Sequence, residues 1–180
     1  ARGKALLDGG VRYLGGTNET YGNINTSDSL WVIRDLVFNQ KKYTLRQLND
    51  AMLANFNGYE ALRKDCLNCD KYGNDLETAD TMANDLYEFV AKGVRNRGIA
   101  IGMQYFLIVI SNNQLNTEWG NRTAASPDGR LSCMYMNPAN NPQGGANKSG
   151  PTAMLNSLAK FDAKYHGGSV QNIKFSPSMF

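Results

Sequence analysis

Hydrophobic and polar positions along the chain change their spacing several times, and each change predicts a new element. Residues 1–26 are rich in Gly, Asn and Thr and have no helical period, so they predict a loop. Apolar side chains then recur at helical spacing, and Ser27 or Asp28 is a suitable N-cap for this helix. The pattern predicts that the first helix ends near Lys41.

A second helix is indicated by its start signal. Thr44 followed by Gln47 forms a capping-box pattern, and the apolar face after it extends to Gly58. A third short helix is expected to continue through Leu62. The Gly- and Asn-containing segment Asp70–Asp75 predicts a turn after it.

A long amphipathic helix is predicted next, with Gly98 as its stop signal and basic residues near its negative C-terminal end. Its expected buried face consists of the larger apolar residues Met82, Leu86, Phe89, Val90 and Val94.

The period changes again at Tyr105–Ile110, which is continuously apolar and rich in β-branched residues. This composition is typical of a strand buried on both faces in a parallel sheet. Residues 111–150 predict a long loop region, and Gly150-Pro151 predicts the start of a helix that continues through Lys160. A second strand is expected at Ser169–Phe175. Helices alternating with buried strands predict an α/β fold that is largely helical with few strands.

Composition narrows the class of protein. Charged residues make up 19% and hydrophobic residues 42% of the 180 residues, which excludes a disordered chain. The net charge of +3 comes from scattered basic residues, so we expect no nucleic-acid partner. No apolar run approaches the ~18 residues of a membrane helix, so we expect no membrane partner. An odd number of cysteines, three, fits a reducing compartment, and we expect a cytoplasmic protein.

Candidate metal and redox residues are few. Cys66 and Cys69 have the spacing of a redox or zinc half-site, but no second pair exists, so we interpret them as packing cysteines. Cys133 has no His or Lys near it in sequence to lower its thiol pKa. His166 is the only histidine, and one imidazole does not build a metal site. We predict no metal site and place His166 on a turn.

The glycine-rich loop before the last predicted helix, residues 144–150, invites comparison with a phosphate-binding loop. Pro142 and Asn147 occupy the two positions where that motif requires glycine, so nucleotide binding is not expected. An anion at this helix start remains physically reasonable.

Five stretches, in order, resemble blocks of the glycyl radical enzymes of the pyruvate formate-lyase family, and together they cover nearly the whole chain. They are Gly22–Leu30, Lys71–Asp75, Ser126–Arg130, Gly150–Ser157 and Asn172–Pro177. The resemblance implies that the chain is part of a β/α barrel, supplying late strands and outer helices. We expect one partial domain, with a loop at 1–26, a helical segment at 27–98, and barrel strands, the Pro-Asp-Gly-Arg loop and one helix at 99–180.

Family chemistry, as the resemblance implies it, uses a glycyl radical that oxidises a cysteine. Neither a Gly-Cys-Val-Glu-like loop nor an Arg-Val-x-Gly-Tyr-like motif occurs in the chain, so we predict an internal fragment without catalytic residues and without a cofactor bound by the chain itself. The implied partners are the rest of the enzyme, a radical S-adenosylmethionine activating enzyme and a small-molecule substrate, in a homodimer when full length.

The segment after Pro-Asp-Gly-Arg resembles the family loop whose residues reach the substrate pocket. Ala139, Asn140 and Asn141 are therefore predicted to bind substrate, with Asn172 as a second candidate; a satisfied Asx-turn is the alternative. The Asn-Pro pair resembles formate-lyases, which favours formate C-acetyltransferase-like chemistry over a related radical lyase or dehydratase. A non-catalytic α/β module that binds a partner or an anion is the other hypothesis.

Overall fold

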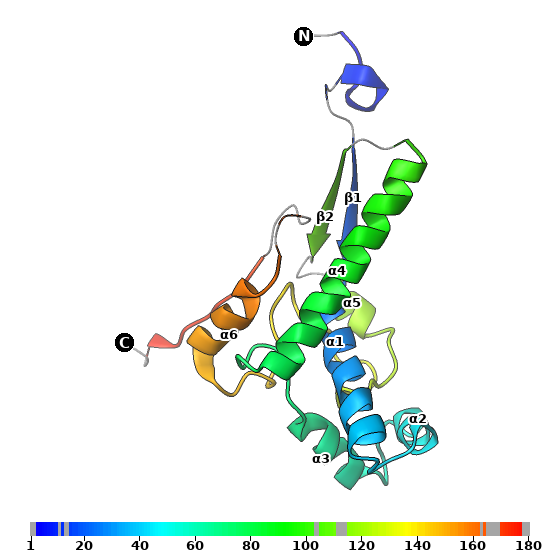
Figure 1. Ribbon diagram of the computed structural model, residues 1–180, viewed down its shortest axis with the longest axis vertical. Coiled ribbons are helices and arrows are strands. Elements are labelled where there is room, and N and C mark those ends of the chain that lie inside the picture. The colour runs from blue at the N-terminus through cyan, green and yellow to red at the C-terminus, as the bar shows by residue number, and fades with distance from the viewer. Residues whose placement is uncertain are drawn as a thin grey trace.

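A computed structural model of the chain describes residues 3–10, 12, 15–102, 105–110, 115–162, 164 and 170–177. This part is largely helical with few strands, as the sequence predicts (Figure 1). The elements in chain order are the π-helix η1 (Leu6–Gly10), β1 (Gly15–Thr20), α1 (Asn23–Val32), the π-helix η2 (Ile33–Asn39), α2 (Leu45–Leu53), α3 (Glu60–Asn68), α4 (Glu77–Ala100), β2 (Tyr105–Ile110), α5 (Leu115–Gly120) and α6 (Gly150–Ala159). No helix in these ranges combines the length and the apolarity that a membrane crossing requires.

The sheet that the structure describes consists of two parallel strands. β1 pairs with β2 in a register that runs from Gly15 opposite Tyr105 to Thr20 opposite Ile110. The predicted strand at 105–110 and its parallel pairing are thus confirmed. The prediction of a loop over all of residues 1–26 is wrong, because residues 15–20 receive their strand geometry from a partner about ninety residues away and not from local propensity.

Helix α1 begins earlier than its cap signals predict. Gly22, with φ of +70°, is the N-cap, while Ser27 and Asp28 lie inside the helix and are buried. The helix continues directly into η2, and Gln40 closes it by donating its backbone N–H to Asp35 O, so the predicted end near Lys41 is confirmed. Only glycine accepts the left-handed N-cap conformation without a steric cost, which explains why the earlier start is used.

The predicted capping box is confirmed at the start of α2. The Thr44 hydroxyl accepts a hydrogen bond from Gln47 N at 3.1 Å, and the Gln47 side chain accepts one from Thr44 N at 2.9 Å. The helix ends at Leu53 instead of near Gly58, because Asn55 and Phe56 adopt positive φ values of 51° and 61°. That turn places the Phe56 ring in the core.

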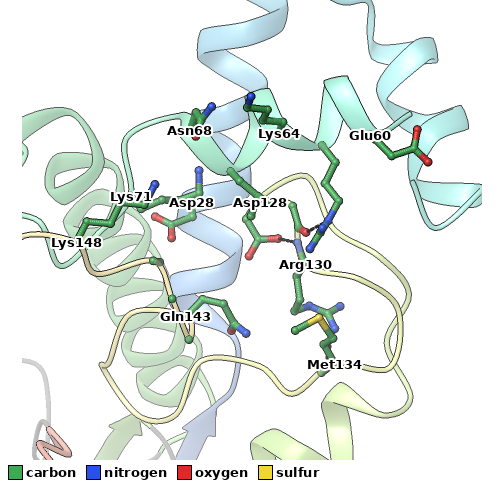
Figure 2. A pocket seen from close by; sticks show the side chains of 16 residues that line it. Asp28, Glu60, Lys64, Asn68, Lys71, Asp128, Arg130, Met134, Gln143 and Lys148 are labelled. Atoms are coloured by element: carbon green, nitrogen blue, oxygen red, sulfur yellow. Dashed lines mark hydrogen bonds between the residues drawn. The ribbon is translucent and has the colours of Figure 1, made fainter. Parts of the chain in front are cut away.

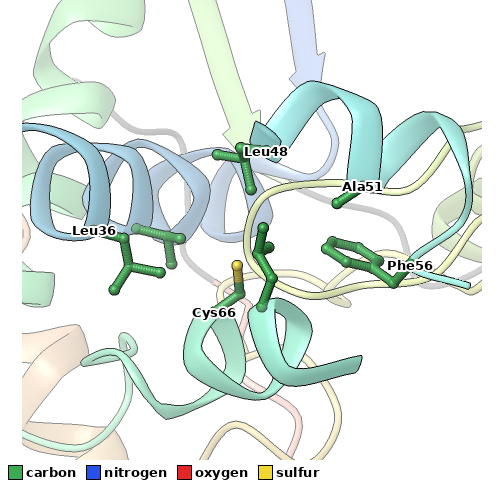
Figure 3. Close-up of a cluster of buried hydrophobic side chains, with 7 residues drawn as sticks. Leu36, Leu48, Ala51, Phe56 and Cys66 are labelled. Atoms are coloured by element: carbon green, nitrogen blue, oxygen red, sulfur yellow. The ribbon is translucent and has the colours of Figure 1, made fainter. Parts of the chain in front are cut away.

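One hydrophobic core lies between η2, α2 and α3 (Figure 3). Its fully buried members come from these three helices, the end of α1 and the turn after α2: Val32, Leu36, Leu48, Ala51, Phe56, Leu62 and Cys66. The Cys66 thiol is a core side chain, and burial raises its pKa to about 12. Cys69 is partly buried and packs against the same core, so the packing interpretation of Cys66 and Cys69 is confirmed.

The long helix α4 is confirmed, but the prediction of its buried face is wrong. Phe89 is 76% exposed, whereas the buried stripe consists of Ala79, Ala83, Tyr87 and Ala91 at intervals of four residues. Small side chains let α1 approach α4 closely. Among the larger apolar residues that the sequence selects, Phe89 is exposed and the others are half-buried: Met82, Leu86, Val90 and Val94. The helix also continues past the predicted stop at Gly98, which is buried, to Ala100.

The C-terminal half follows the prediction in part. α6 starts at Gly150-Pro151 as expected, and the turn at Asp70–Asp75 is confirmed. The predicted long loop contains the short helix α5, and residues 170–176 form no strand. Within the described ranges, the backbone of Val170 and Asn172 bonds to Asn140 and Asn141 of a loop and to no strand. The prediction of a strand at Ser169–Phe175 is therefore wrong for residues 170–175. His166 and Ser169 lie outside the described residues.

Candidate functional site

The four predicted substrate-binding residues come together in the structure. Pro138 O accepts a hydrogen bond from Asn141 N at 2.9 Å, which closes a tight turn with Ala139 at φ of +54°. A left-handed alanine costs roughly 1 kcal/mol, so the surrounding contacts must fix this turn. Ala139, Asn140 and Asn141 are all buried, whereas Asn172 is exposed.

The Asn141 carboxamide forms the pair of hydrogen bonds to a backbone that a neighbouring strand would form. Its Nδ2 donates to Asn172 O at 2.6 Å, and its Oδ1 accepts from Asn172 N at 3.0 Å. This two-way bond ties the turn to the segment 170–177, which the sequence predicts as a strand. The Asn141 carboxamide is therefore satisfied within the chain.

Asn140 connects the same turn to α4. Its side-chain oxygen accepts a hydrogen bond from the Tyr87 hydroxyl, and its backbone N–H donates to Val170 O at 3.2 Å. Tyr87 stacks on Phe161 with ring centroids 4.1 Å apart, and Phe161 stacks on Tyr72 at 5.4 Å. Burial raises the pKa of both tyrosines, so the Tyr87 hydroxyl donates to Asn140 in its neutral form.

A second pair of amides anchors the turn from its other side. Asn137 N donates to Asn25 Oδ1 at 2.7 Å, and Asn25 N donates to Asn137 Oδ1 at 3.2 Å. The Asn25 carboxamide also donates to Asp128 Oδ2 at 2.6 Å and to Gln143 Oε1 at 3.0 Å. These buried bonds connect the start of α1 to the loop 126–130 and to the loop 137–143.

Sequence reasoning found the turn and Asn172 but missed Tyr87, Phe161 and the Asn25–Asn137 pair. Tyr87 had one available signal, because it follows Ala79 and Ala83 at intervals of four residues in α4. Asn25 and Asn137 are 112 positions apart, and no local pattern joins them. The contact of Asn140 and Asn141 with substrate stays a prediction, since the observed partners belong to the chain itself.

The sequence matches the models of two protein families. The model described as "Pyruvate formate lyase-like" matches residues 1–115, and the model described as "Glycine radical" matches residues 136–180. The chain is 33% identical over 179 residues to trans-4-hydroxy-L-proline dehydratase of Clostridioides difficile, which covers 99% of this chain and 23% of that protein. It is 34% identical to isethionate sulfite-lyase of Bilophila wadsworthia, over 83% of this chain and 18% of the relative.

Solved structures agree with the family models. The glycerol-bound B12-independent glycerol dehydratase from Clostridium butyricum superimposes with a TM-score of 0.81 and 29% identity, over 88% of this chain and 20% of that chain. Hydroxyproline dehydratase of Clostridioides difficile with bound substrate gives a TM-score of 0.81 and 30% identity, over 89% of this chain and 20% of that chain. The chain thus spans about a fifth of the length of the relatives it matches, and the expectation that it is part of their barrel fold is confirmed. It belongs to the pyruvate formate lyase-like family of glycyl radical enzymes.

Proposed function

We propose that this chain is the part of a glycyl radical lyase or dehydratase that supplies barrel wall and one loop of the substrate pocket. The observation that carries the proposal is the likeness to dehydratases of known structure, which extends over both family models. The three segments predicted at 1–26, 27–98 and 99–180 belong to one partial domain in this proposal, because β1 of the first pairs with β2 of the third.

The reaction class that we propose is elimination. The relatives named above are dehydratases and a sulfite-lyase, so they are named for the release of water or sulfite. Formate C-acetyltransferase-like chemistry, which the Asn-Pro pair favours, is the competing outcome of the same experiment. A non-catalytic binding module is the third function that this experiment distinguishes.

The match to the glycine-radical model implies a glycyl radical as the cofactor of the family. The 180 residues contain neither an Arg-Val-x-Gly-Tyr-like nor a Gly-Cys-Val-Glu-like pattern. Cys133 is exposed and follows the Pro-Asp-Gly-Arg block, so it does not match the family's cysteine position. The residues present therefore do not supply the radical glycine or its cysteine, and we assign no reaction step to them. A radical S-adenosylmethionine activating enzyme, a homodimer and a cytoplasmic location complete the proposal.

Ala139, Asn140, Asn141 and Asn172 are proposed to border the substrate. Buried hydrogen bonds already hold the turn, and such a fixed loop suits a pocket that must position a polar substrate precisely. Asn172 is the best test residue, because its contact with Asn141 uses backbone atoms and survives replacement of the side chain.

The experiment expresses the full polypeptide that the gene encodes, under anaerobic conditions with its activating enzyme. Electron paramagnetic resonance measures the glycyl radical, and trans-4-hydroxy-L-proline, glycerol, isethionate and pyruvate with coenzyme A are offered as substrates. A radical signal with elimination of water or sulfite from one of the first three supports the proposal. Acetyl transfer from pyruvate would replace elimination by the formate-lyase reaction, and absence of any radical would support the non-catalytic module.

For the pocket, Asn172→Ala is compared with Asn49→Ala, an exposed asparagine on α2. Loss of one substrate hydrogen bond of ~1 kcal/mol lowers kcat/KM by about fivefold in the first variant and leaves the second unchanged. Equal kinetics of both variants, with a normal radical signal, would remove Asn172 from the pocket without affecting the proposed family reaction.

A further inference from the structure

A cavity of about 390 Å³ lies apart from the turn described above, between α1, α3 and the loops 126–130 and 143–148 (Figure 2). Cavities of this size are typical of small-molecule sites. None of Ala139, Asn140, Asn141 and Asn172 lines it. The activity proposed for the chain therefore assigns it no role.

Positive charge dominates the cavity wall. Five basic side chains line it, against the three acidic side chains of Asp28, Glu60 and Asp128; the basic ones are Arg63, Lys64, Lys71, Arg130 and Lys148. The ion pairs found among the described residues involve none of these five. The cavity is accordingly suited to a ligand of negative charge.

Two of the basic groups are held by neutral partners. The Lys71 ammonium, which is buried, donates to Cys66 O at 2.5 Å and to Cys69 O at 3.1 Å, at the C-terminal end of α3. The Arg130 guanidinium likewise donates to backbone carbonyls, those of Ala124, Leu131 and Met134, the last at 2.8 Å. These bonds fix the position of both groups without neutralising their charge. Lys64 and Lys148 are exposed at the same cavity.

Asp28 supplies a polar atom that lacks a partner within the described part of the chain. The side chain is 1% exposed, and its Oδ1 accepts the Tyr72 backbone N–H at 2.9 Å. Its Oδ2 is buried without any hydrogen-bond partner in that part. An unmet hydrogen bond of this kind costs roughly 1–3 kcal/mol, and a ligand atom in the cavity would supply it.

The protonation of Asp28 suits an anionic ligand. Burial raises the pKa of this carboxyl to about 8, Asp128 and Asp80 raise it further, and Lys71 and the Tyr72 N–H oppose the rise. At neutral pH the group is a neutral O–H donor, so it does not repel an anion. A metal cation is disfavoured here, because no group of three metal-ligating side chains occurs in the described ranges.

The remaining wall is apolar or small. Leu67, Met134 and Ala146 provide hydrocarbon surface, and a Cβ at Gly145 would meet nothing within 4 Å. A bare inorganic anion would leave the apolar surface without contact, whereas an organic anion would use both parts.

We propose that this cavity is a binding site for a small organic anion, with the charged group held by Lys64 and Lys148 and a hydrogen-bonding atom at the Asp28 carboxyl.

The test measures binding by isothermal titration calorimetry on the full polypeptide that the gene encodes, so its result does not depend on the glycyl radical. Benzenesulfonate is the probe, because its charge does not change with pH and its ring matches the apolar wall. Benzenesulfonamide serves as the neutral control of the same shape, and inorganic sulfate as the anion without a ring. One benzenesulfonate per chain is expected, with binding at least tenfold tighter than that of either control compound.

Charge-removing variants locate the site. Lys64→Gln and Lys148→Gln are each expected to weaken benzenesulfonate binding by about fivefold. Arg46→Gln, which removes an exposed charge on α2 outside the cavity, is expected to change nothing. Binding by the parent protein should weaken as the pH rises from 6 to 9 and Asp28 ionises, and Asp28→Asn should abolish this dependence.

Four results would overturn the proposal. They are absence of saturable benzenesulfonate binding, equal affinity for the sulfonamide, equal affinity for inorganic sulfate, and equal loss in all three charge variants. The lysine variants keep the test decisive even where Asp28→Asn lowers the yield of folded protein, because both lysines are exposed.

Discussion

Replacement of Asp28 by Asn tests whether a buried, protonated carboxyl sets the pH dependence of stability. Asp28 lies in α1, and its Oδ1 accepts the Tyr72 backbone N–H at 2.9 Å. Asparagine keeps that acceptor and presents an amide N–H₂ at the place of the unpartnered Oδ2. The groups that face Asp28 are Lys71, Asp128 and Asp80, and the substitution leaves all three in place.

The magnitude follows from the two pKa values of the carboxyl. Burial raises the pKa from 3.8 to about 8 in the folded chain, so between these values the folded state holds one proton more than the unfolded state. Stability consequently falls as the pH rises through this window, by a factor of ten in the unfolding equilibrium per pH unit. At pH 6, about two units above the ordinary value, the loss attributable to Asp28 amounts to about 3 kcal/mol.

The assay is urea unfolding followed by far-ultraviolet circular dichroism, at half-unit steps from pH 4 to 8. The free-energy difference between Asp28→Asn and the parent chain should grow in favour of the variant by about 2.4 kcal/mol between pH 4 and pH 6, because about 0.6 of the 3 kcal/mol is already lost at pH 4. Asp50→Asn, at an exposed position of α2, is the matched control and should give a difference that stays constant. A constant difference for Asp28→Asn as well would refute the inference that this carboxyl is protonated in the folded state.

Three further outcomes depend on local geometry. Gly73→Ala should destabilise the chain by about 3 kcal/mol or more in the same urea assay, because φ is +91° and the new Cβ would lie 2.2 Å from Pro142 Cγ. Gly58→Ala, with φ of +78° but open space around its Cβ, should cost only about 1 kcal/mol, and equal losses would contradict the steric argument. Maleimide at pH 7 should label the exposed Cys133 long before Cys66, whose pKa burial raises to about 12; peptide mass spectrometry measures the order, and prior labelling of Cys66 would show that its core position is wrong.

The elements that sequence predicts correctly are those specified by neighbouring residues. The Thr44–Gln47 capping box and the proline at the start of α6 act within one helical turn, and both are confirmed. β1 is different, since Gly15–Thr20 contains two glycines and no β-branched run, and it is a strand because Tyr105–Ile110 pairs with it. Pairing over such a distance leaves no local signal.

The buried face of α4 was predicted wrongly for a related reason. Counting large apolar residues favours Met82, Leu86 and Phe89, whereas the observed contact with α1 selects the small residues Ala79 and Ala83. Which face is buried depends on how closely the partner helix approaches, and that distance is a property of the pair. The sequence of one helix alone does not contain it.

The candidate site shows the same division between local and long-range information. Resemblance to family blocks was sufficient to select Ala139, Asn140, Asn141 and Asn172, and the structure brings them together. Resemblance did not reveal that Asn141 pairs with the Asn172 backbone or that Asn140 accepts from Tyr87. Those contacts join residues that are 31 and 53 positions apart, so no local sequence pattern predicts them and only the structure shows them.

Helix α1 explains how the turn and the cavity are held at a fixed separation. Asn25 bonds to the backbone of Asn137 beside the turn. Asp28, which lies one helical turn further on and lines the cavity, accepts the backbone N–H of Tyr72. Ser29 accepts the backbone N–H of Asp128 at 3.2 Å, which fixes the loop between them. All of these bonds are buried. If one of them breaks, a buried polar group has neither a protein partner nor water to bond to, which costs free energy, so the bonds favour a single arrangement of the loops. The polar residues of α1 therefore hold both the turn and the cavity loops in place. This explains why the buried face of the helix carries Asn, Asp and Ser in place of leucine.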